Sequence, residues 1–316
     1  MTPKVLVTGG AGFIGSHLAE ALLNRGARVV ALDNLSLGTT TNLEWSSGRP
    51  DFEFVQGDAG DPSLLSRLLP GCTWVFHQAA LPSVPRSVAE PVASNTQNLT
   101  ASLNLLEASR AAGVRRFVFA SSSAIYGDND APSKHESLPP NPLSPYALQK
   151  YAAERYGQMF HQFHGLPAVG LRYFNVFGPR QAFDSPYSGV IARFCTLMLR
   201  GEAPTIFGDG TQSRDFTYIE NVVQANLKAV DAPEERAAGQ VFNIAGGGSI
   251  SLLDLVGELN RLCGTRLQPR FEPARPGDVK HSRADIGAAR AALGYEPKVS
   301  WQEGLQRTLA WYRDTK

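Results

Sequence analysis

The stretch TGGAGFIGSH (8–17) constrains the fold more than any other part of this chain. It lies between the apolar run KVLVT (4–8) and the helix-like SHLAEALLNRG (16–26), and it carries Gly9, Gly12 and Gly15. Glycines at this spacing permit a tight turn, a close approach of backbone to a pyrophosphate, and close packing of the helix on the strand. The helix N-terminus then offers free N–H groups to phosphate. A glycine-rich turn without a ligand is the alternative, but the position between a first strand and a helix favours a dinucleotide site.

Short apolar runs alternate with helical patterns along the first half of the chain. Apolar strands without a polar face are typical of a parallel sheet that helices cover on both sides. The expected strands are 4–8, 28–33, 52–58, 73–80, 115–123 and 168–178, and the expected helices are 16–26, 63–69, about 94–112 and about 145–164. We therefore expect an α/β fold with a doubly wound parallel sheet of the Rossmann type.

The pattern changes after Gly178. Residues 185–210 mix a helix with Gly/Pro turns, and the runs FTYIENVVQANLKAV and QVFNIAGGG then predict one more helix–strand unit that returns to the sheet. We expect a nucleotide-binding domain formed by residues 1–177 and about 215–246. A smaller C-terminal α/β lobe for the substrate would comprise about 178–214 and 247–316.

Composition argues against several other function classes. The formal charge of +1 gives no general attraction to nucleic acid or to an anionic membrane. Cys72, Cys195 and Cys263 are widely spaced and odd in number, which indicates reduced thiols of a cytoplasmic protein. The pair His161-x-x-His164 has no further ligand group beside it, so we expect no metal site. The first strand is expected at residue 4, which leaves no room for a signal peptide, and no apolar run is long enough to span a bilayer. We expect a soluble protein.

Asp33, at the end of the second expected strand, predicts which dinucleotide binds. It lies 24 residues after Gly9, where a carboxylate accepts hydrogen bonds from both ribose hydroxyls. An adenosine 2′-phosphate would meet repulsion there, and no Arg follows directly, so NAD is favoured over NADP. Asp58, in GDAGDPS after the third strand, is either a contact to the adenine edge or part of a helix N-cap.

Tyr146 and Lys150 lie four residues apart in SPYALQK, and therefore on one face of the expected helix. Ser122 lies in the strand-ending run FVFASSS, 24 residues before Tyr146, and the carboxyl ends of parallel strands face the cofactor crevice. An ammonium and a cationic nicotinamide would lower the pKa of a tyrosine from its usual value of about 10. Tyr146 would then exchange a proton with a carbinol whose carbon gives hydride to NAD, while Ser122 hydrogen-bonds the same oxygen.

The chain resembles the extended short-chain dehydrogenase/reductase superfamily along essentially its whole length. The motifs that carry the resemblance are TGGAGFIGSH, the position of Asp33, SSSAIYGD, SPYALQK, LRYFNVFGPRQ, GDGTQSRDFTYIENV and RPGDVKHSRAD, in this order. Within it, the chain is most similar to nucleotide-sugar 4-epimerases, especially the bacterial UDP-N-acetylglucosamine (or its uronic acid) 4-epimerases. The resemblance implies tightly bound NAD, a UDP-sugar substrate, and a homodimer formed through the helices around 94–112 and 145–164.

The resemblance also implies the roles of individual residues. Ser122, Tyr146 and Lys150 would be catalytic. The implied cofactor contacts are Gly9, Gly12, Phe13, Ile14, Gly15, Asp33, Asn34, Ser36, Gly38, Asp58, Ala59, Gln78, Ala79, Ala80, Asn98, Tyr146 and Lys150. The implied substrate contacts are Ser83, Ser122, Ser123, Tyr146, Asn175, Gly189, Val190, Phe207, Arg214, Arg275, Asp278 and Ser282. Among them, the two arginines would bind the UDP diphosphate, the aspartate the uridine ribose, and the phenylalanine uracil.

Two positions bear on the choice of reaction within this family. Its 4,6-dehydratases and UDP-glucuronate decarboxylases carry an acidic residue just after the catalytic Ser/Thr. Here Ser122 is followed by Ser123 and Ala124, which favours epimerisation through one reversible oxidation at C4. Ser282 aligns with the position that limits room beside the C2 substituent of the sugar, and a serine there leaves space for an N-acetyl group.

Three functions remain open from the sequence. A UDP-GlcNAc/UDP-GalNAc 4-epimerase is favoured, although the acetylated-sugar branch has Gly-Ser where this chain has Pro82-Ser83. A UDP-glucose or UDP-glucuronate 4-epimerase with a narrower pocket is the alternative. Arg86 would meet a uronate carboxylate in that case, or else pair with Glu90 at i+4. A non-catalytic NAD-binding module is the remote third, and it would lack catalytic residues that this chain has.

Overall fold

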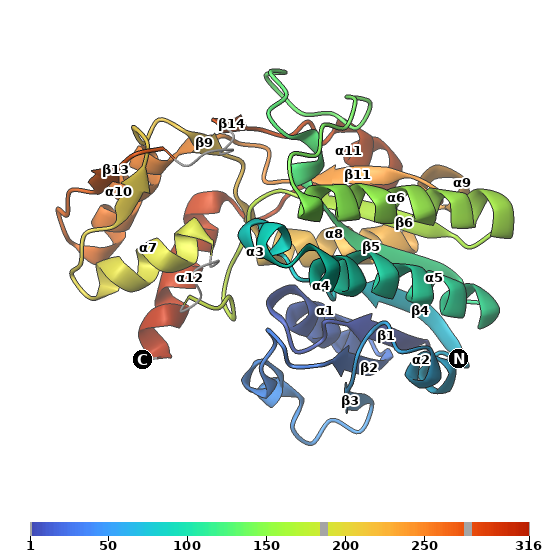
Figure 1. The fold of residues 1–316 in the computed structure, drawn as a ribbon. Helices are drawn as coiled ribbons and strands as arrows, with labels where there is room; N and C mark the ends of the chain where they lie inside the picture. The colour runs from blue at the N-terminus through green and yellow to red at the C-terminus, as the bar shows by residue number, and fades with distance from the viewer. Residues whose placement is uncertain (1, 184–188, 275–279, 316) are drawn as a thin grey trace.

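The main sheet of the protein contains seven parallel strands. The computed structural model describes residues 2–183, 189–274 and 280–315, so that Arg275 and Asp278 lie outside the described residues. The strand order is β11-β6-β5-β4-β1-β2-β3 (Figure 1). These strands are β1 (Lys4–Thr8), β2 (Arg28–Asp33), β3 (Phe52–Gln56), β4 (Cys72–His77), β5 (Arg116–Ser122), β6 (Ala168–Tyr173) and β11 (Val241–Ile244). The sheet grows outward in both directions from the β1–β4 pair, so the predicted doubly wound Rossmann fold is confirmed.

Helices cover both faces of the sheet because alternate residues of each strand point to opposite sides. Val5 and Val7 belong to one hydrophobic core, together with residues of α1 (Phe13–Asn24) and α8 (Ile219–Asp231). Leu6 belongs to a second core on the other face. The helices that supply this second core are α2 (Pro62–Leu68), α5 (Ala101–Ala111) and α6 (Pro145–His164).

Several short elements connect these layers. The helix expected at about 94–112 is a continuous helical run formed by α4 (Pro91–Asn95), the π-helical turn η2 (Thr96–Thr100) and α5. The remaining connecting elements are the 3₁₀ turns η1 (Thr40–Ser46) and η3 (Ser123–Tyr126) and the helices α3 (Val84–Ala89) and α9 (Glu234–Ala237). The predicted return to the sheet is confirmed, because β11 pairs with β6 in parallel.

The strand expected over 168–178 is divided in two. β6 ends at Tyr173, and β7 (Val176–Phe177) leaves the main sheet to pair in parallel with β10 (Thr217–Tyr218). Between the two strands, Asn175 has a φ of 33°, which turns the chain away from the sheet. The Thr217 backbone N–H donates to the Asn175 carbonyl at 3.2 Å, and this contact fixes the turn.

The C-terminal lobe is smaller and carries short mixed sheets. Strands β9 (Ser213–Arg214), β12 (Ile250–Ser251) and β14 (His281–Ser282) form one sheet, and β8 (Thr205–Phe207) pairs with β13 (Arg270–Glu272). The helices of this lobe include α7 (Val190–Leu199), α10 (Leu252–Cys263) and α12 (Trp301–Asp314), while α11 (Gly287–Leu293) packs near β11. Ser251 and Asp254 form a capping box at the start of α10, which fixes where that helix begins.

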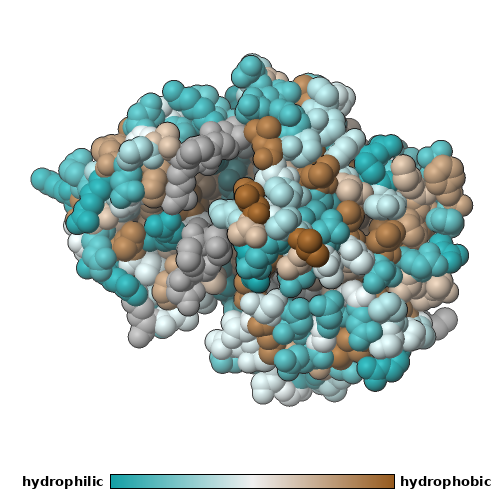
Figure 2. Space-filling model, viewed as in Figure 1, coloured by the Kyte–Doolittle hydropathy of each residue, from teal (hydrophilic) through white to brown (hydrophobic). Residues whose placement is uncertain are grey.

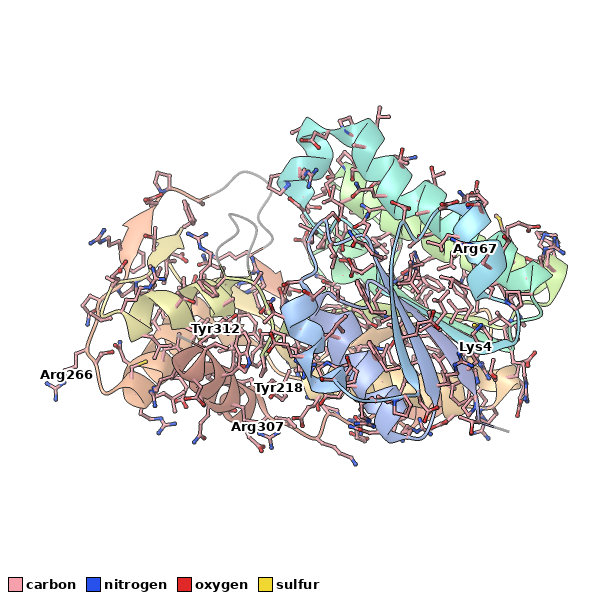
Figure 3. The ribbon with its side chains drawn as sticks, turned by 90° about the horizontal axis from the view of Figure 1, so that it is seen from below. Lys4, Arg67, Tyr218, Arg266, Arg307 and Tyr312 are labelled. Carbon is pink, nitrogen blue, oxygen red and sulfur yellow. The ribbon has the colours of Figure 1, made fainter. Side chains whose placement is uncertain are left out.

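The last helix, α12, ties the two lobes together. Figure 3 shows Tyr218 and Arg307 close together, toward the lower edge of that view. The Arg307 guanidinium lies 5.9 Å from the Tyr218 ring centroid. Arg307 also pairs with Glu220 at 2.9 Å. Tyr312 of α12 donates its hydroxyl to the Gln181 carbonyl at 2.6 Å, in the segment that enters the C-terminal lobe. The space-filling view is hollowed between the two lobes (Figure 2).

Two features are absent from the residues that the structure describes, a membrane-spanning helix and a metal-binding cluster. No helix there has both the length and the apolar character that a bilayer crossing requires. In those same ranges, no three His, Cys, Asp or Glu side chains gather in a way that would hold a metal ion. Cys72, Cys195 and Cys263 are all free thiols.

Candidate active site

The glycine loop leaves no room for side chains at Gly9 and Gly15. Gly9 has a φ of 67°, and a Cβ there would lie 2.7 Å from the Ala79 backbone nitrogen. A Cβ on Gly15 would lie 2.0 Å from the Gly9 carbonyl oxygen. Gly12 is the N-cap of α1, and Phe13 and Ile14 form the first turn of this helix. The bare backbone and the helix N-terminus together fit the pyrophosphate of a dinucleotide.

Asp33 holds its charge beside this loop. The carboxylate is buried and accepts the backbone N–H groups of Ala11 at 3.0 Å and Leu35 at 2.8 Å. A Cβ on Gly38 would lie 2.9 Å from the Asp33 Oδ2 atom, so the chain passes directly over the carboxylate. Each carboxylate oxygen has a second lone pair that remains for a ribose hydroxyl. A phosphate at this place would meet a fixed negative charge.

The N-cap interpretation of Asp58 was wrong. Asp61 caps α2 instead, and its side chain accepts the Ser63 backbone N–H at 2.8 Å. Asp58 accepts the Asn34 side-chain amide at 3.3 Å and the Gly60 N–H at 2.7 Å. Its contact to adenine stays a prediction. The neighbouring predicted cofactor residues are Ser36, whose N–H donates to Asn34 Oδ1, and the buried Ala59.

The loop after β4 is held by groups from two sides. The backbone N–H of Gln78 donates to the Thr8 carbonyl at 3.1 Å, and that of Ala79 donates to the Thr8 hydroxyl at 3.3 Å. These bonds fix the start of the segment that continues through Ala80. Asn98, in the π-helical turn η2, accepts the Leu81 N–H at 2.7 Å and is only 2% exposed. Asn98 therefore shapes this loop.

The helix that carries Tyr146 and Lys150, α6, begins where its sequence predicts. Ser144 is the N-cap, with its hydroxyl accepting the Ala147 N–H at 3.2 Å, and Pro145 follows at the first helical position. The Tyr146 backbone N–H donates to the Ser87 hydroxyl at 3.1 Å. Lys150 is buried, its Nζ donates to the Ala120 carbonyl at 2.9 Å, and the same atom lies 6.0 Å from the Tyr146 ring centroid.

Burial governs the ionisation of these groups. Burial raises the pKa of Tyr146 above its usual value, and a hydrogen bond with the Ser122 hydroxyl opposes the rise. Burial lowers the pKa of the Lys150 ammonium to about 8, and the Glu154 carboxylate opposes that shift. The structure therefore brings Ser122, Tyr146 and Lys150 together at the carboxyl end of β5. In this arrangement a phenol has an ammonium and a hydroxyl beside it, which suits proton exchange with a substrate oxygen.

The predicted substrate residues lie on several elements. Arg214 on β9 is the register partner of Ser282 on β14, so their side chains share one face of that small sheet. Asn175 lies in the turn between β6 and β7, and its side-chain amide donates to the Asp215 carbonyl at 3.2 Å. The other predicted positions are Ser123 at the start of η3, Gly189 as the N-cap of α7, Val190 as its first residue, and Phe207 at the end of β8.

Two predicted contacts have partners within the protein. The buried Ser83 caps α3 and accepts the Arg86 N–H at 3.2 Å. Arg86 pairs with Glu90 at 3.2 Å, as the second of its two interpretations predicted.

Two buried acids near the site, Glu154 and Asp215, were not predicted from the sequence. Glu154 lies one turn after Lys150 and pairs with Arg172 of β6 at 2.7 Å. Asp215 is fully buried, accepts the Gly246 N–H at 2.9 Å, and has its pKa raised by burial to about 7. The spacing of Glu154 from Lys150 was the available signal for the first acid. For Asp215, we find no signal other than its position after Arg214.

Known proteins match this chain over nearly its whole length. The model of the NAD dependent epimerase/dehydratase family matches residues 5–245. A UDP-N-acetylglucosamine 4-epimerase from Methanobrevibacter ruminantium M1, solved in complex with UDP-N-acetylmuramic acid, is 39% identical with a TM-score of 0.95, and the match covers 100% of both chains. A UDP-glucose 4-epimerase from Thermotoga maritima, solved with UDP-glucose, is 41% identical with a TM-score of 0.93 over 99% of both chains.

A third solved structure contains both a UDP-sugar and NAD. It is a UDP-glucuronic acid 4-epimerase from Bacillus cereus in complex with UDP-glucuronic acid and NAD. This protein is 36% identical with a TM-score of 0.92, and the match covers 99% of this chain and 100% of that one.

We predict that Gly15→Ala prevents dinucleotide binding, because the new methyl group overlaps the Gly9 carbonyl oxygen. The overlap should also cost about 1–3 kcal/mol of the free energy of unfolding. Gly257→Ala is the matched control, since a Cβ there meets no atom within 4 Å and Gly257 lies inside α10. Calorimetric NAD titration and urea unfolding measure both effects. Wild-type NAD affinity in Gly15→Ala would contradict the assigned role of this loop.

Proposed function

Since this chain belongs to the NAD dependent epimerase/dehydratase family, we propose that it is a UDP-sugar 4-epimerase that interconverts UDP-GlcNAc and UDP-GalNAc. UDP-glucose/UDP-galactose and the uronic acids are further candidate substrates. The observation that carries the proposal is the group formed by Ser122, Tyr146 and Lys150, with no carboxylate directly after Ser122. Similar proteins with 4-epimerase names, identical at 36–41%, support the reaction class.

NAD fits the first lobe. The side-chain-free backbone at Gly9 and Gly15 would hold its pyrophosphate, and the Asp33 carboxylate would accept hydrogen bonds from its adenosine ribose. When bound, NAD takes a hydride from C4 of the sugar and returns it. Because the cofactor is restored in each cycle, the enzyme needs no second substrate.

The side chains of this chain handle the proton. Tyr146 takes the proton of the C4 hydroxyl when the sugar is oxidised and gives it back when the sugar is reduced. The Lys150 ammonium stabilises the phenolate form of Tyr146, and Ser122 donates a hydrogen bond to the same substrate oxygen. Loss of hydride from one face of C4 and its return to the other face invert the configuration at that carbon. Between the two steps the sugar rotates while its diphosphate stays bound to Arg214.

Elimination of the neighbouring hydroxyl requires an acid that this site lacks beside Ser122. Ser123 and Ala124 occupy the next two positions, at the start of η3, and neither side chain can act as a carboxylic acid. A dehydratase needs a proton donor for the leaving hydroxyl. Because this donor is missing beside Ser122, the proposed reaction ends with epimerisation.

The choice of sugar rests on Ser282 and Arg86. Ser282 shares a face with Arg214, so a sugar whose diphosphate binds that arginine lies near a small side chain, which leaves space for an acetamide. A UDP-glucose epimerase is the second candidate, and the Thermotoga maritima relative supports it. A preference for uronic acids is disfavoured, because the guanidinium that would meet the carboxylate already pairs with Glu90.

The assembly, domains and setting are part of the same proposal. We infer a homodimer formed through α4, α5 and α6, where exposed apolar side chains lie among polar ones (Figure 2). These side chains are Val92, Leu148, Tyr156, Met159 and Phe163. The UDP-sugar would bind residues of about 178–214 and 247–316, and NAD those of 1–177 and about 215–246. The free thiols suit a reducing cytoplasm.

Tyr146→Phe should retain NAD binding and lose at least about a hundredfold in kcat, because the ring stays while the proton carrier is removed. Turnover of UDP-GlcNAc, followed by NMR of the anomeric protons, measures this loss. Calorimetry with NAD shows whether the cofactor site is intact. Normal turnover in this variant would exclude Tyr146 as the proton carrier.

Ser282→Tyr should lower kcat/KM for UDP-GlcNAc at least about tenfold more than for UDP-glucose, because the larger side chain takes the space of the acetamide. The same NMR assay on both sugars measures the ratio. Ser249→Tyr, in the loop before β12, is the control for adding a bulky side chain in this lobe. Equal losses on both sugars would remove Ser282 from the choice of substrate, and no turnover of UDP-GlcNAc by the wild type would favour the UDP-glucose alternative.

Leu148→Glu combined with Phe163→Glu should convert the dimer into a monomer, because burying two carboxylates in an apolar interface costs more than the interface gains. Leu148 and Phe163 are 56% and 68% exposed, so neither change disturbs the core. Leu253→Glu, on α10 of the other lobe, is the control. Analytical ultracentrifugation measures the mass. A monomeric wild type would contradict the proposed assembly.

A further inference from the structure

A buried ion pair lies behind the catalytic helix. Glu154 of α6 is 1% exposed and Arg172 of β6 is 4% exposed. The Arg172 Nη2 atom lies 2.7 Å from Glu154 Oε2, and its Nε atom lies 2.8 Å from Glu154 Oε1. The guanidinium thus binds the carboxylate through two parallel hydrogen bonds, which is the strongest geometry for such a pair. A charged group at this depth persists only because its partner is equally buried.

The carboxylate has a third partner. The Ser121 hydroxyl, at the end of β5, donates to Glu154 Oε1 at 2.5 Å. Three donors from two strands therefore hold one carboxylate of α6. The result is a negative charge whose position is fixed by the sheet.

This charge lies one helical turn beyond Lys150. Residues four apart share a helix face, so Glu154 and Lys150 are neighbours on the side of α6 that meets the sheet. Lys150 is 6% exposed, and its Nζ donates to a neutral carbonyl, that of Ala120. Burial in such surroundings disfavours the ammonium, whereas the Glu154 charge favours it.

We propose that Glu154 is a positioning residue of the epimerase reaction, whose fixed charge keeps the Lys150 ammonium protonated beside Tyr146. This inference rests on the proposed function, because it concerns the group that stabilises the Tyr146 phenolate. Glu154 touches neither substrate nor cofactor in this proposal, and it acts through Lys150. Arg172 and Ser121 hold the carboxylate in place for that purpose.

The other charged and titratable groups packed around α6 do not replace Glu154. His77 of β4 is buried, and burial together with the Lys150 charge lowers its pKa to about 3, so this imidazole is neutral. On the neighbouring η3, burial raises the pKa of Tyr126 to about 12, so this phenol is neutral too. Tyr173 of β6 has its pKa raised to about 12 in the same way. The carboxylates of the packed helices α3–α5 are Glu90, at the end of α3, and Glu107, and both are half-exposed and paired with arginines.

These charges determine in which direction the pKa of Lys150 should shift when Glu154 is replaced. Lys150 has a pKa of about 8, and it is protonated below that pH. Glu154→Gln removes the negative charge and retains the shape, so the pKa of Lys150 should fall by about one unit. Turnover should then begin to fall at correspondingly lower pH on its alkaline side. KM for the UDP-sugar should change less than twofold, because Glu154 does not contact the substrate.

The experiment measures the pKa of Lys150 directly. The chain has seven lysines, so protein labelled with ¹⁵N at the lysine side chains gives few signals, and Lys150→Met identifies the one of interest. The pH titration is run on the NAD-loaded wild type, on Glu154→Gln, on Glu154→Asp, and on Glu107→Gln as the matched control. Glu107 is a helical carboxylate paired with Arg110 on the exposed side of α5. We expect the pKa of Lys150 to fall in Glu154→Gln and to stay within about 0.3 units of the wild-type value in the other two variants.

A pKa of Lys150 that is unchanged in folded Glu154→Gln would overturn the proposal, even if that variant is less stable. Removing one partner of a buried pair can prevent folding, so Glu154→Gln/Arg172→Gln is the second variant, because it leaves no buried charge unpaired. The charge that favours the Lys150 ammonium is that of Glu154, and Arg172 causes no opposing shift, so the pKa of Lys150 should fall here as well. The titration requires no turnover. Failure of the wild type to epimerise any UDP-sugar would therefore contradict the proposed function, whereas an unchanged pKa contradicts only the role of Glu154.

Discussion

The approach of the first helix to the first loop is the constraint on which the cofactor site depends. Gly15 lies so close to the Gly9 carbonyl that a single methyl group would overlap it, and this contact sets how near the N-terminus of α1 comes to the end of β1. Asp33 then binds the backbone of the same loop through Ala11. The loop, the helix and the second strand form one rigid unit because each fixes the others by backbone contacts. A side chain at Gly9 or Gly15 would separate its parts.

Local patterns predicted most of the fold. The order of strands and helices up to Tyr173 follows from apolar periodicity, and α6 starts at its Ser-Pro cap and ends at a left-handed glycine. The errors came from contacts between distant segments. The division of the strand at Asn175 depends on Thr217, which is far away in the sequence, so the run AVGLRYFNVFG alone did not predict it. The helix cap after β3 is Asp61, and the run GDAGDPS offered a second aspartate, Asp58, as a possible cap.

In the candidate site, too, local relations were predictable and contacts between distant segments were not. Tyr146 and Lys150 were predictable because four residues along a helix fix their relation, and Ser122 because parallel strands end at one edge. The ion pair of Arg172 could not be predicted, because the sequence of β6 does not indicate which acidic residue contacts an arginine within that strand. Its bond to Glu154 joins α6 to β6, and its bond to Tyr126 leads on to Asn243 of β11. Neighbouring strands are thus linked beneath α6 by charge and hydrogen bonds as well as by apolar packing.

The pairing of β9 with β14 has an evolutionary consequence. The Ser282 carbonyl accepts the Asp215 N–H at 2.8 Å, so the main chain at Ser282 is held by backbone bonds whatever side chain it carries. Arg214, next to it in the register, keeps its place for the same reason. The side chain at position 282 can therefore be replaced without displacing the backbone of Arg214. The backbone of this small sheet therefore tolerates substitution at position 282, and a single codon change there alters the surface beside Arg214 while the fold is kept.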